Sequence, residues 1–149
     1  MQTKHGVKLI MIDYLQLLNI RDYAGQGRQL ETVNISANIK AMAKELDVPV
    51  IVLSQLSRAP ENRDKEGTPR ISDLRDSGAI EQDADVVMLL WRPSYYANKI
   101  KDQTGQPPVD DTIAKVDIGK NRNGATGVAE LVFESEFTQF SDAMSSGHD

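Results

Sequence analysis

Two cations stand two residues apart in GKNRNGATG, the stretch from residue 119 to residue 127: Lys120 and Arg122. An alternating apolar segment precedes them, and a turn rich in Asn and Gly follows. If the strand continues through both, their side chains point the same way, because alternate residues of a strand share a face. An ammonium beside a guanidinium suits a phosphate group. A turn whose cations merely keep a hairpin in solution is the alternative interpretation.

Two apolar runs end in polar residues. Asp13 closes VKLIMID (7–13), and Ser54 and Gln55 close VPVIVLSQ (48–55). Runs rich in Val and Ile are typical of buried strands in a parallel sheet, where ligands bind beyond the carboxyl ends. An apolar strand ending in Asp is how NTPases hold Mg²⁺ beside nucleotide phosphates. A carboxylate that only caps the next loop is the alternative.

A polar stretch, DLRDSGAIEQDAD, begins at Asp73. Gly78 lets backbone N–H groups approach an anion closely, and we expect a short helix after Ser77. Arg75 together with exposed N–H groups could bind a nucleic-acid backbone without reading its bases. A loop in which Arg75 pairs with Asp73 and Asp76 is the alternative. Further along, an aromatic cluster follows the third apolar run and could either stack on a base or cover the sheet edge: Trp91, Tyr95 and Tyr96.

The elements that must position these residues follow from periodicity. Apolar residues step by four, three and four through 28–46, which predicts one face of a helix: Ile35, Ile39, Met42 and Leu46. A strand, this helix and a second strand form a right-handed crossover unit. The run DVVMLLWR (85–92) predicts a third strand of the same buried, parallel kind.

The end of the chain alternates instead. Residues 112–120 and 128–135 predict an antiparallel hairpin across the Gly-rich turn, and 137–140 predicts a last short strand. The composition is that of an ordinary globular chain: 149 residues, 40% hydrophobic, net charge -5 and no cysteine. The charge argues against a non-specific nucleic-acid binder. No apolar run is long enough to span a membrane, and no signal-peptide pattern is found, so we expect a cytoplasmic protein without a membrane partner.

Four stretches together resemble one family: GVKLIMIDYLQLL, IKAMAKELDVPVIVLSQLSR, SDLRDSGAIEQDADVVMLLWR and KNRNGATG. They are similar, in this order, to motifs of the C-terminal motor domain of DnaB-type replicative DNA helicases, from about Gly6 to Phe140. The resemblance implies an α/β, RecA-like fold: a mostly parallel sheet with helical crossovers and a C-terminal antiparallel hairpin, truncated before the P-loop. It assigns 1–141 to that domain and leaves 142–149 as a flexible tail.

Carried over by position, four residues match a site for ATP and Mg²⁺. Asp13 matches the Walker B aspartate, which supports Mg²⁺ through water, and Gln55 matches the residue that senses the γ-phosphate. Lys120 and Arg122 match the pair, including the arginine finger, that reaches into the nucleotide site of the neighbouring subunit. The resemblance therefore implies a homo-oligomer, a hexameric ring.

The same resemblance implies a DNA contact. Arg75, Asp76 and Gly78 match the loop that follows the backbone of single-stranded DNA in the channel of the ring, although many relatives have Glu in place of Asp76. Other replisome proteins are implied as partners.

The P-loop of the family, G-x-x-x-x-G-K-[ST], is not found, since the only Gly-Lys pair is Gly119-Lys120 and Asn121 follows it. We therefore expect ATP hydrolysis and DNA unwinding only in a full-length protein, and none from this chain alone. A non-catalytic module that joins or caps a helicase ring is the alternative. A recombinase or repair ATPase of the same fold fits SDLRDSGAIEQDAD less well.

Overall fold

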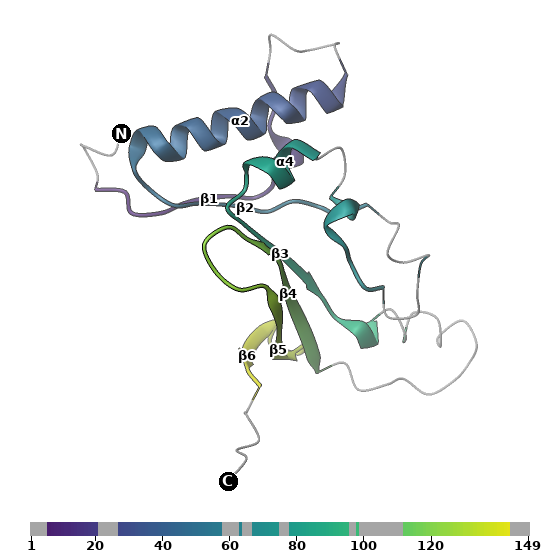
Figure 1. The fold of residues 1–149 in the computed structure, drawn as a ribbon. Coiled ribbons are helices and arrows are strands. Elements are labelled where there is room, and N and C mark those ends of the chain that lie inside the picture. Colours follow the sequence, from purple (N-terminus) through teal and green to yellow (C-terminus); the bar gives the residue numbers. More distant parts are fainter. Residues whose placement is uncertain are drawn as a thin grey trace. The chain divides into compact units, whose positions relative to one another are not determined.

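The structure, a computed structural model, describes residues 6–20, 27–57, 63, 67–74, 78–95, 98 and 112–143. The chain divides into two compact units (Figure 1). The described parts of Met1–Ser57 and Leu74–Ala84 form unit 1, and those of Arg58–Asp73 and Asp85–Asp149 form unit 2. Within these described parts, no helix has the length and apolar character needed to cross a membrane.

Unit 1 contains the predicted strand, helix and strand. β1 (Ile10–Ile12) and β2 (Val50–Val52) are parallel and pair in register, and α2 (Arg28–Leu46) connects them. The helix ends because Asp47 adopts a left-handed conformation, with φ of 51°, and its N–H bonds back to the last turn. The predicted order of strand, helix and parallel strand is confirmed. The prediction that both strands are buried on both faces is wrong, since Met11 is 67% and Ile51 46% exposed.

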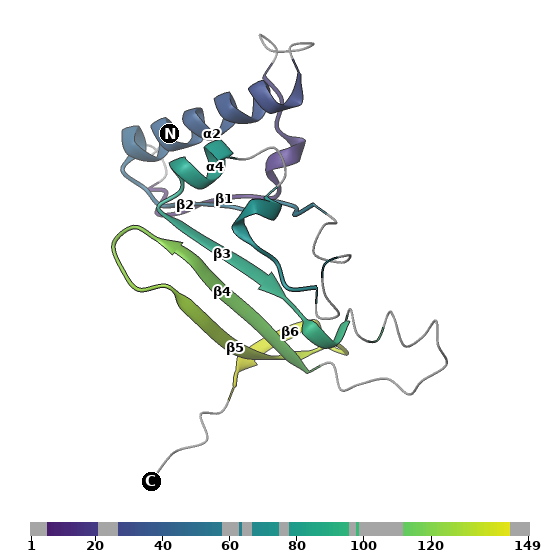
Figure 2. The same ribbon diagram turned by 45° about the vertical axis from the view of Figure 1, so that its right-hand side comes forward.

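The buried face of α2 is centred on Ile35, which is 3% exposed, and the other three predicted apolar residues are half-buried. Ser36 is also buried on this face, and its hydroxyl donates a hydrogen bond of 2.7 Å to the Asp83 carboxylate. Asp83 ends α4 (Gly78–Asp83), the short helix expected after Ser77, which lies beside α2 in both views (Figures 1 and 2). Ser77 itself is outside the described residues.

Unit 2 is a four-stranded antiparallel sheet in chain order (Figure 2). Its strands are β3 (Val86–Trp91), β4 (Ile113–Asn121), β5 (Gly127–Glu134) and β6 (Gln139–Asp142). The predicted hairpin of β4 and β5 is confirmed. The last strand begins two residues later than expected, because residues 135–138 form the turn that leads into it.

β3 differs from its prediction as a parallel strand buried on both faces. It pairs antiparallel with β4, and its residues alternate between buried Val87 and Leu89 and exposed neighbours. Met88 on the other face is 64% exposed. The apolar run here therefore belongs to an antiparallel strand that is buried on one side only.

The segment before β3 is fixed by a buried carboxylate. Asp73 ends the 3₁₀ helix η3 (Ile71–Asp73) and is 3% exposed. It accepts hydrogen bonds from both terminal nitrogens of Arg63 and, at 2.7 Å, from the backbone N–H of Arg70. The Arg63 hydrogen bond is the main reason that the pKa of Asp73 lies below its ordinary value, with the Arg70 N–H adding to it. One carboxylate therefore ties the Arg63 side chain to the backbone that begins η3.

Candidate functional site

The carboxyl edge of the β1–β2 pair is where unit 1 gathers its candidate residues. Asp13 follows β1 directly, and Gln55 lies three residues after the end of β2. The pairing continues past the strands, since the Leu53 N–H bonds to the Ile12 carbonyl and the Leu15 N–H to the Leu53 carbonyl, both at 2.9 Å. The parallel pair therefore brings Asp13 and Gln55 to one edge, and both are exposed to solvent there.

Gln16, which the sequence prediction missed, bridges this edge. It lies in the 3₁₀ helix η1 (Leu15–Leu17) immediately after Asp13 and Tyr14. Its side-chain Nε2 donates to the Ser54 hydroxyl at 3.1 Å and to the Gln55 carbonyl at 3.2 Å, and its Oε1 accepts the Gln55 N–H at 3.3 Å. One amide thus joins the segment after β1 to the segment after β2.

The segment that carries Gln16 is itself tied to the start of α2. Arg28 donates to the carbonyls of Gln16 and Leu18, at 2.8 and 3.0 Å, and forms an ion pair of 2.8 Å with Glu31. Glu31 also accepts the backbone N–H of Ile20 at 2.8 Å. The pKa of the Glu31 carboxyl lies below its ordinary value, chiefly because of the hydrogen bond from the Ile20 N–H. The hydrogen bond from Arg28 lowers this pKa further. The first turn of α2 therefore fixes the backbone of residues 16–20.

The predicted DNA-contact loop is described only at its two ends. Arg75 and Asp76 lie outside the described residues. Before them, Leu74 forms an antiparallel bridge with Leu56. After them, Gly78 begins α4, is exposed, and has no described atom within 4 Å of where a Cβ would stand. Packing among the described residues therefore does not require glycine at this position.

Lys120 and Arg122 both lie in unit 2, at the β4–β5 hairpin. β4 ends at Asn121, so Arg122 is the first residue of the turn and not part of the strand. The register shifts near the end of β4, with Val87 opposite Lys120 and Met88 opposite Ile118, which leaves Gly119 as the extra residue of a bulge. The condition for a shared face, a strand that continues through both cations, is therefore not met, because Arg122 lies in the turn.

Arg122 is held at two points by Asp85. Its N–H bonds to the Asp85 carbonyl at 2.8 Å, and its Nη1 lies 3.3 Å from the Asp85 carboxylate. The two side chains are 51% and 53% exposed, so this is a surface ion pair. The Asn121 side chain closes the turn by bonding to the Ala125 carbonyl and the Asn123 N–H. A Cβ at Gly124 would stand 2.5 Å from the Asn121 amide nitrogen, so a side chain here would displace the amide that closes the turn.

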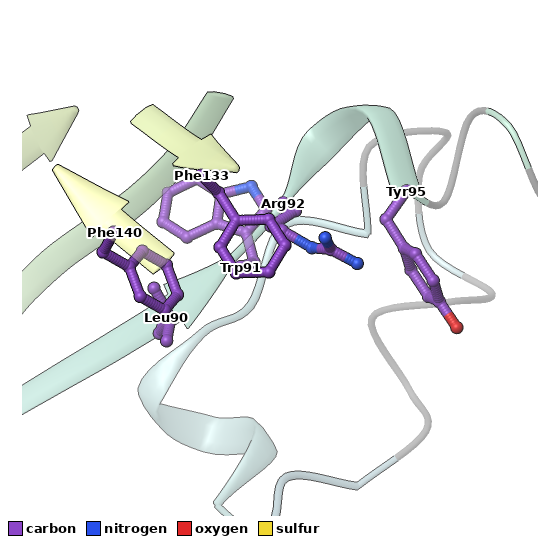
Figure 3. Close-up of a pocket in the computed structure, with 6 residues that line it drawn as sticks. All are labelled: Leu90, Trp91, Arg92, Tyr95, Phe133 and Phe140. Carbon is purple, nitrogen blue, oxygen red and sulfur yellow. The ribbon is translucent and has the colours of Figure 1, made fainter. Parts of the chain in front are cut away.

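An aromatic pocket of about 270 Å³ lies at the far end of β3 (Figure 3). The Arg92 guanidinium carbon is 4.4 Å from the centre of the Phe133 ring and 4.9 Å from that of Tyr95. The Trp91 Nε1 is buried without a hydrogen-bond partner among the described residues. Flat apolar walls with a stacked guanidinium suit a planar ring, which keeps the base-stacking interpretation open for Trp91 and Tyr95. Tyr96 is outside the described residues.

No cluster of three or more His, Cys, Asp or Glu side chains occurs within the described parts of the chain. Asp13 is an exposed carboxylate that directly follows β1. Mg²⁺ commonly binds through one or two carboxylates, waters and substrate phosphates, so the donor set at this edge fits a magnesium–nucleotide complex better than a metal held by protein alone.

Comparison with known proteins gives a consistent result. A family model described as DnaB-like helicase C terminal domain matches residues 1–142. The replicative DNA helicase DnaB of Pasteurella multocida is 46% identical over 135 residues, which cover 91% of this chain and 27% of that protein. The DnaB of Geobacillus stearothermophilus is 43% identical over 140 residues, covering 94% and 29%. The chain thus spans less than a third of the curated relatives it matches.

Solved structures agree with the sequence relatives. The chain is similar to a solved structure described as an ATPase domain, with a TM-score of 0.79 and 40% identity over 95% of this chain and 48% of the other. It is also similar to a DnaB-like replicative helicase studied for its interactions with primase, with a TM-score of 0.78 and 39% identity over 95% and 33%. The RecA-like α/β fold expected from the sequence is confirmed.

Proposed function

Because the chain belongs to the DnaB-like helicase C-terminal domain family, we propose that it is part of a motor that unwinds duplex DNA by ATP hydrolysis in a hexameric ring. The observation that carries this proposal is the carboxyl edge of β1 and β2, where Asp13 and Gln55 follow neighbouring parallel strands. In open α/β sheets this edge is where ligands bind.

Each residue of the edge has a distinct part in the proposed chemistry. When bound, Mg²⁺ would neutralise charge on the β- and γ-phosphates of ATP. Asp13 would support the hydrated ion, a role that suits an exposed carboxylate outside any described cluster of three or more acidic or His side chains. Gln55 places its amide beside the γ-phosphate and distinguishes ATP from the hydrolysed product.

Lys120 and Arg122 act on the nucleotide of a neighbouring subunit. A planar, permanently charged guanidinium can contact two phosphoryl oxygens as charge develops in the transition state. The Asn121-closed turn supports this assignment, because it fixes the backbone of Arg122 while leaving half of its side chain exposed. A rigid backbone with an exposed cation is what a contact in trans requires.

The loop containing Arg75, Asp76 and Gly78 contacts the backbone of single-stranded DNA. This part of the proposal is supported by the exposed position of Gly78, where no described atom lies within 4 Å of a Cβ site and the missing side chain lets a phosphate approach the backbone closely. As part of a larger motor the chain would also meet other replisome proteins. Primase is the partner named for one structural relative.

Turnover by mixed rings tests this function. In a full-length protein that carries this chain, Arg122→Ala should lower the DNA-stimulated rate of ATP hydrolysis by roughly 10³-fold or more, while nucleotide binding and ring assembly persist. Asp13→Ala should also be inactive. Mixing the two inactive proteins should restore part of the activity, because some interfaces then pair an intact Asp13 with an intact Arg122.

Lys115→Ala is the matched control. It removes a cation from β4, the strand that leads into the Arg122 turn, and the partner of this cation is Glu130 across the hairpin at 3.2 Å. It should leave the rate within about twofold of the wild type, as expected for a surface ion pair. Wild-type turnover by the Arg122→Ala ring would refute the finger. If neither Arg122→Ala nor Asp13→Ala lowers the turnover of rings that contain the chain, a non-catalytic module that joins or caps the ring becomes the better description.

A further inference from the structure

Beyond the end of the β1–β2 ladder, the side chain of Gln16 forms the hydrogen bonds to the Gln55 backbone that a paired strand would otherwise form. The ladder of β1 and β2 covers three residue pairs and is extended by the Leu15 N–H bond to the Leu53 carbonyl. Beyond that bond the first segment stops running alongside the second, because residues 15–17 turn into η1. The Gln16 amide supplies both a donor and an acceptor to the backbone of Gln55 instead.

The Gln16 amide uses both its nitrogen and its oxygen on Ser54 and Gln55. Its Nε2 donates to the Ser54 hydroxyl and to the Gln55 carbonyl, which matches the two N–H donors of a primary amide. Its oxygen accepts the Gln55 N–H. The three bonds hold the backbone of Gln55 where the chain leaves β2, and the Gln55 side chain projects from this backbone.

The base of this amide is also fixed. Leu15, next to Gln16, is 3% exposed and anchors η1, while Arg28 donates to the Gln16 carbonyl at 2.8 Å. Arg28 is itself oriented by its ion pair with Glu31. Hydrogen bonds therefore connect α2 to the Gln16 backbone, and the Gln16 side-chain amide to Gln55.

We infer that Gln16 is a positioning residue for Gln55, coupling the segment that carries Asp13 to the segment that carries Gln55 so that both hold one geometry at the nucleotide edge. The inference rests on the proposed function, because it takes Gln55 to be the group that meets the γ-phosphate. A positioning residue touches neither nucleotide nor metal. Its loss should therefore weaken the chemical step more than the binding of ATP.

The size of the effect follows from geometry. Displacing a positioned group by about 1 Å can lower a rate about 10²-fold. We expect the loss of all three Gln16 bonds to allow residues 54–55 a displacement of about that size. We expect Gln16→Met in the full-length protein to lower kcat for DNA-stimulated ATP hydrolysis by roughly 10- to 100-fold. Methionine keeps the length of the side chain and removes its donors and acceptor, so the KM for ATP should stay within about threefold.

A graded variant separates hydrogen bonding from packing. Gln16→Glu keeps an oxygen for the Gln55 N–H and can accept a bond from the Ser54 hydroxyl, but it cannot donate to the Gln55 carbonyl. It should therefore retain more activity than Gln16→Met. Asn34→Ala is the control, because it removes another side-chain amide of unit 1 whose bond is local, to the Leu30 carbonyl at 2.8 Å. Its kcat should match the wild type.

A double-mutant cycle provides the decisive measurement. If Gln16 acts through Gln55, Gln16→Met should have no further effect on kcat in a Gln55→Ala background, because the group that it positions is already gone. A wild-type kcat for Gln16→Met would overturn the inference. The inference would also be overturned if Gln16→Met lowered kcat by the same factor in the Gln55→Ala background as in the wild type. Such an additive loss would indicate general damage to unit 1.

The same cycle distinguishes this inference from the proposed function. If Gln55→Ala alone hydrolyses ATP at the wild-type rate, the proposed function of Gln55 fails, and the positioning role of Gln16 fails with it. If Gln55→Ala is slow while Gln16→Met is not, only the inference about Gln16 is overturned. Circular dichroism and ring assembly of each variant, measured at the assay temperature, confirm that the rates compare folded proteins.

Discussion

Neutralising Asp73 should destabilise unit 2. This carboxylate is 3% exposed and receives hydrogen bonds from two nitrogens of Arg63 and from the Arg70 N–H. Asp73→Asn keeps its shape but removes the charge and turns an NH₂ group towards those donors. Hydrogen bonds to charged groups contribute about 1.5–3 kcal/mol, so we expect Asp73→Asn to lower the free energy of unfolding by about 2–3 kcal/mol at pH 7.

The single tryptophan makes this measurable. Trp91 lies in β3 of the same unit, so its fluorescence during urea unfolding of the chain reports on the unit that contains Asp73. Asp142→Asn is the control, because it neutralises an exposed carboxylate of β6 in the same unit. Its effect should stay within about 0.5 kcal/mol. Equal unfolding free energies for the two variants would refute the importance of the buried pair.

The pH dependence provides a second check. The pKa of Asp73 in the folded chain lies below its ordinary value of 3.8, so the folded state binds this proton less readily than the unfolded state. The stabilisation is therefore present above the ordinary pKa and is lost as the pH falls through the folded pKa. The difference between wild type and Asp73→Asn should be constant from pH 7 to about pH 5 and shrink below that. A difference that persists unchanged to about pH 3 would contradict the linkage.

Two further outcomes are expected of the isolated chain. Its affinity for a labelled single-stranded oligonucleotide, measured by fluorescence anisotropy, should be weak, independent of sequence and lower at higher salt, because one loop neutralises few phosphates. Tight binding that is insensitive to salt would contradict the Arg75 assignment. The chain should also self-associate in light scattering, since Met11 is 67% and Met88 64% exposed on apolar strands. Met11→Lys with Met88→Lys should reduce the association, and a compact wild-type monomer would refute the expectation.

Local periodicity explains which elements could be predicted from the sequence. The helix 28–46 repeats apolar residues at helical spacing, and the hairpin alternates about an Asn- and Gly-rich turn, so both follow from neighbours within a few positions. The faces of β3 do not follow in this way. VVMLLW is apolar on both sides, so the run itself does not show which side is buried. Its antiparallel pairing depends on β4, whose residues lie about 30 positions along the chain.

The candidate site shows the same limit. Asp13 and Gln55 are recognisable because each ends an apolar run, and strand order alone brings parallel ends to one edge. Gln16 gives no such signal, since a glutamine between leucines could as well face water. Its role depends on contacts with Ser54 and Gln55, which lie 38 and 39 residues away in the sequence. Asp85 was equally hidden, because its partner is a turn residue of the distant hairpin.

The ion pair between Arg122 and Asp85 is compatible with a finger that acts on a neighbouring subunit. Both side chains are about half exposed, so their pair contributes at most about 1 kcal/mol. The backbone of Arg122 is fixed without it, by the Asp85 carbonyl and by the Asn121 side chain in the turn. A phosphate carries more charge and can accept two parallel guanidinium bonds, which are stronger than a single contact of 3.3 Å. Exchanging Asp85 for a phosphate therefore costs little, and the guanidinium begins from an already restricted position.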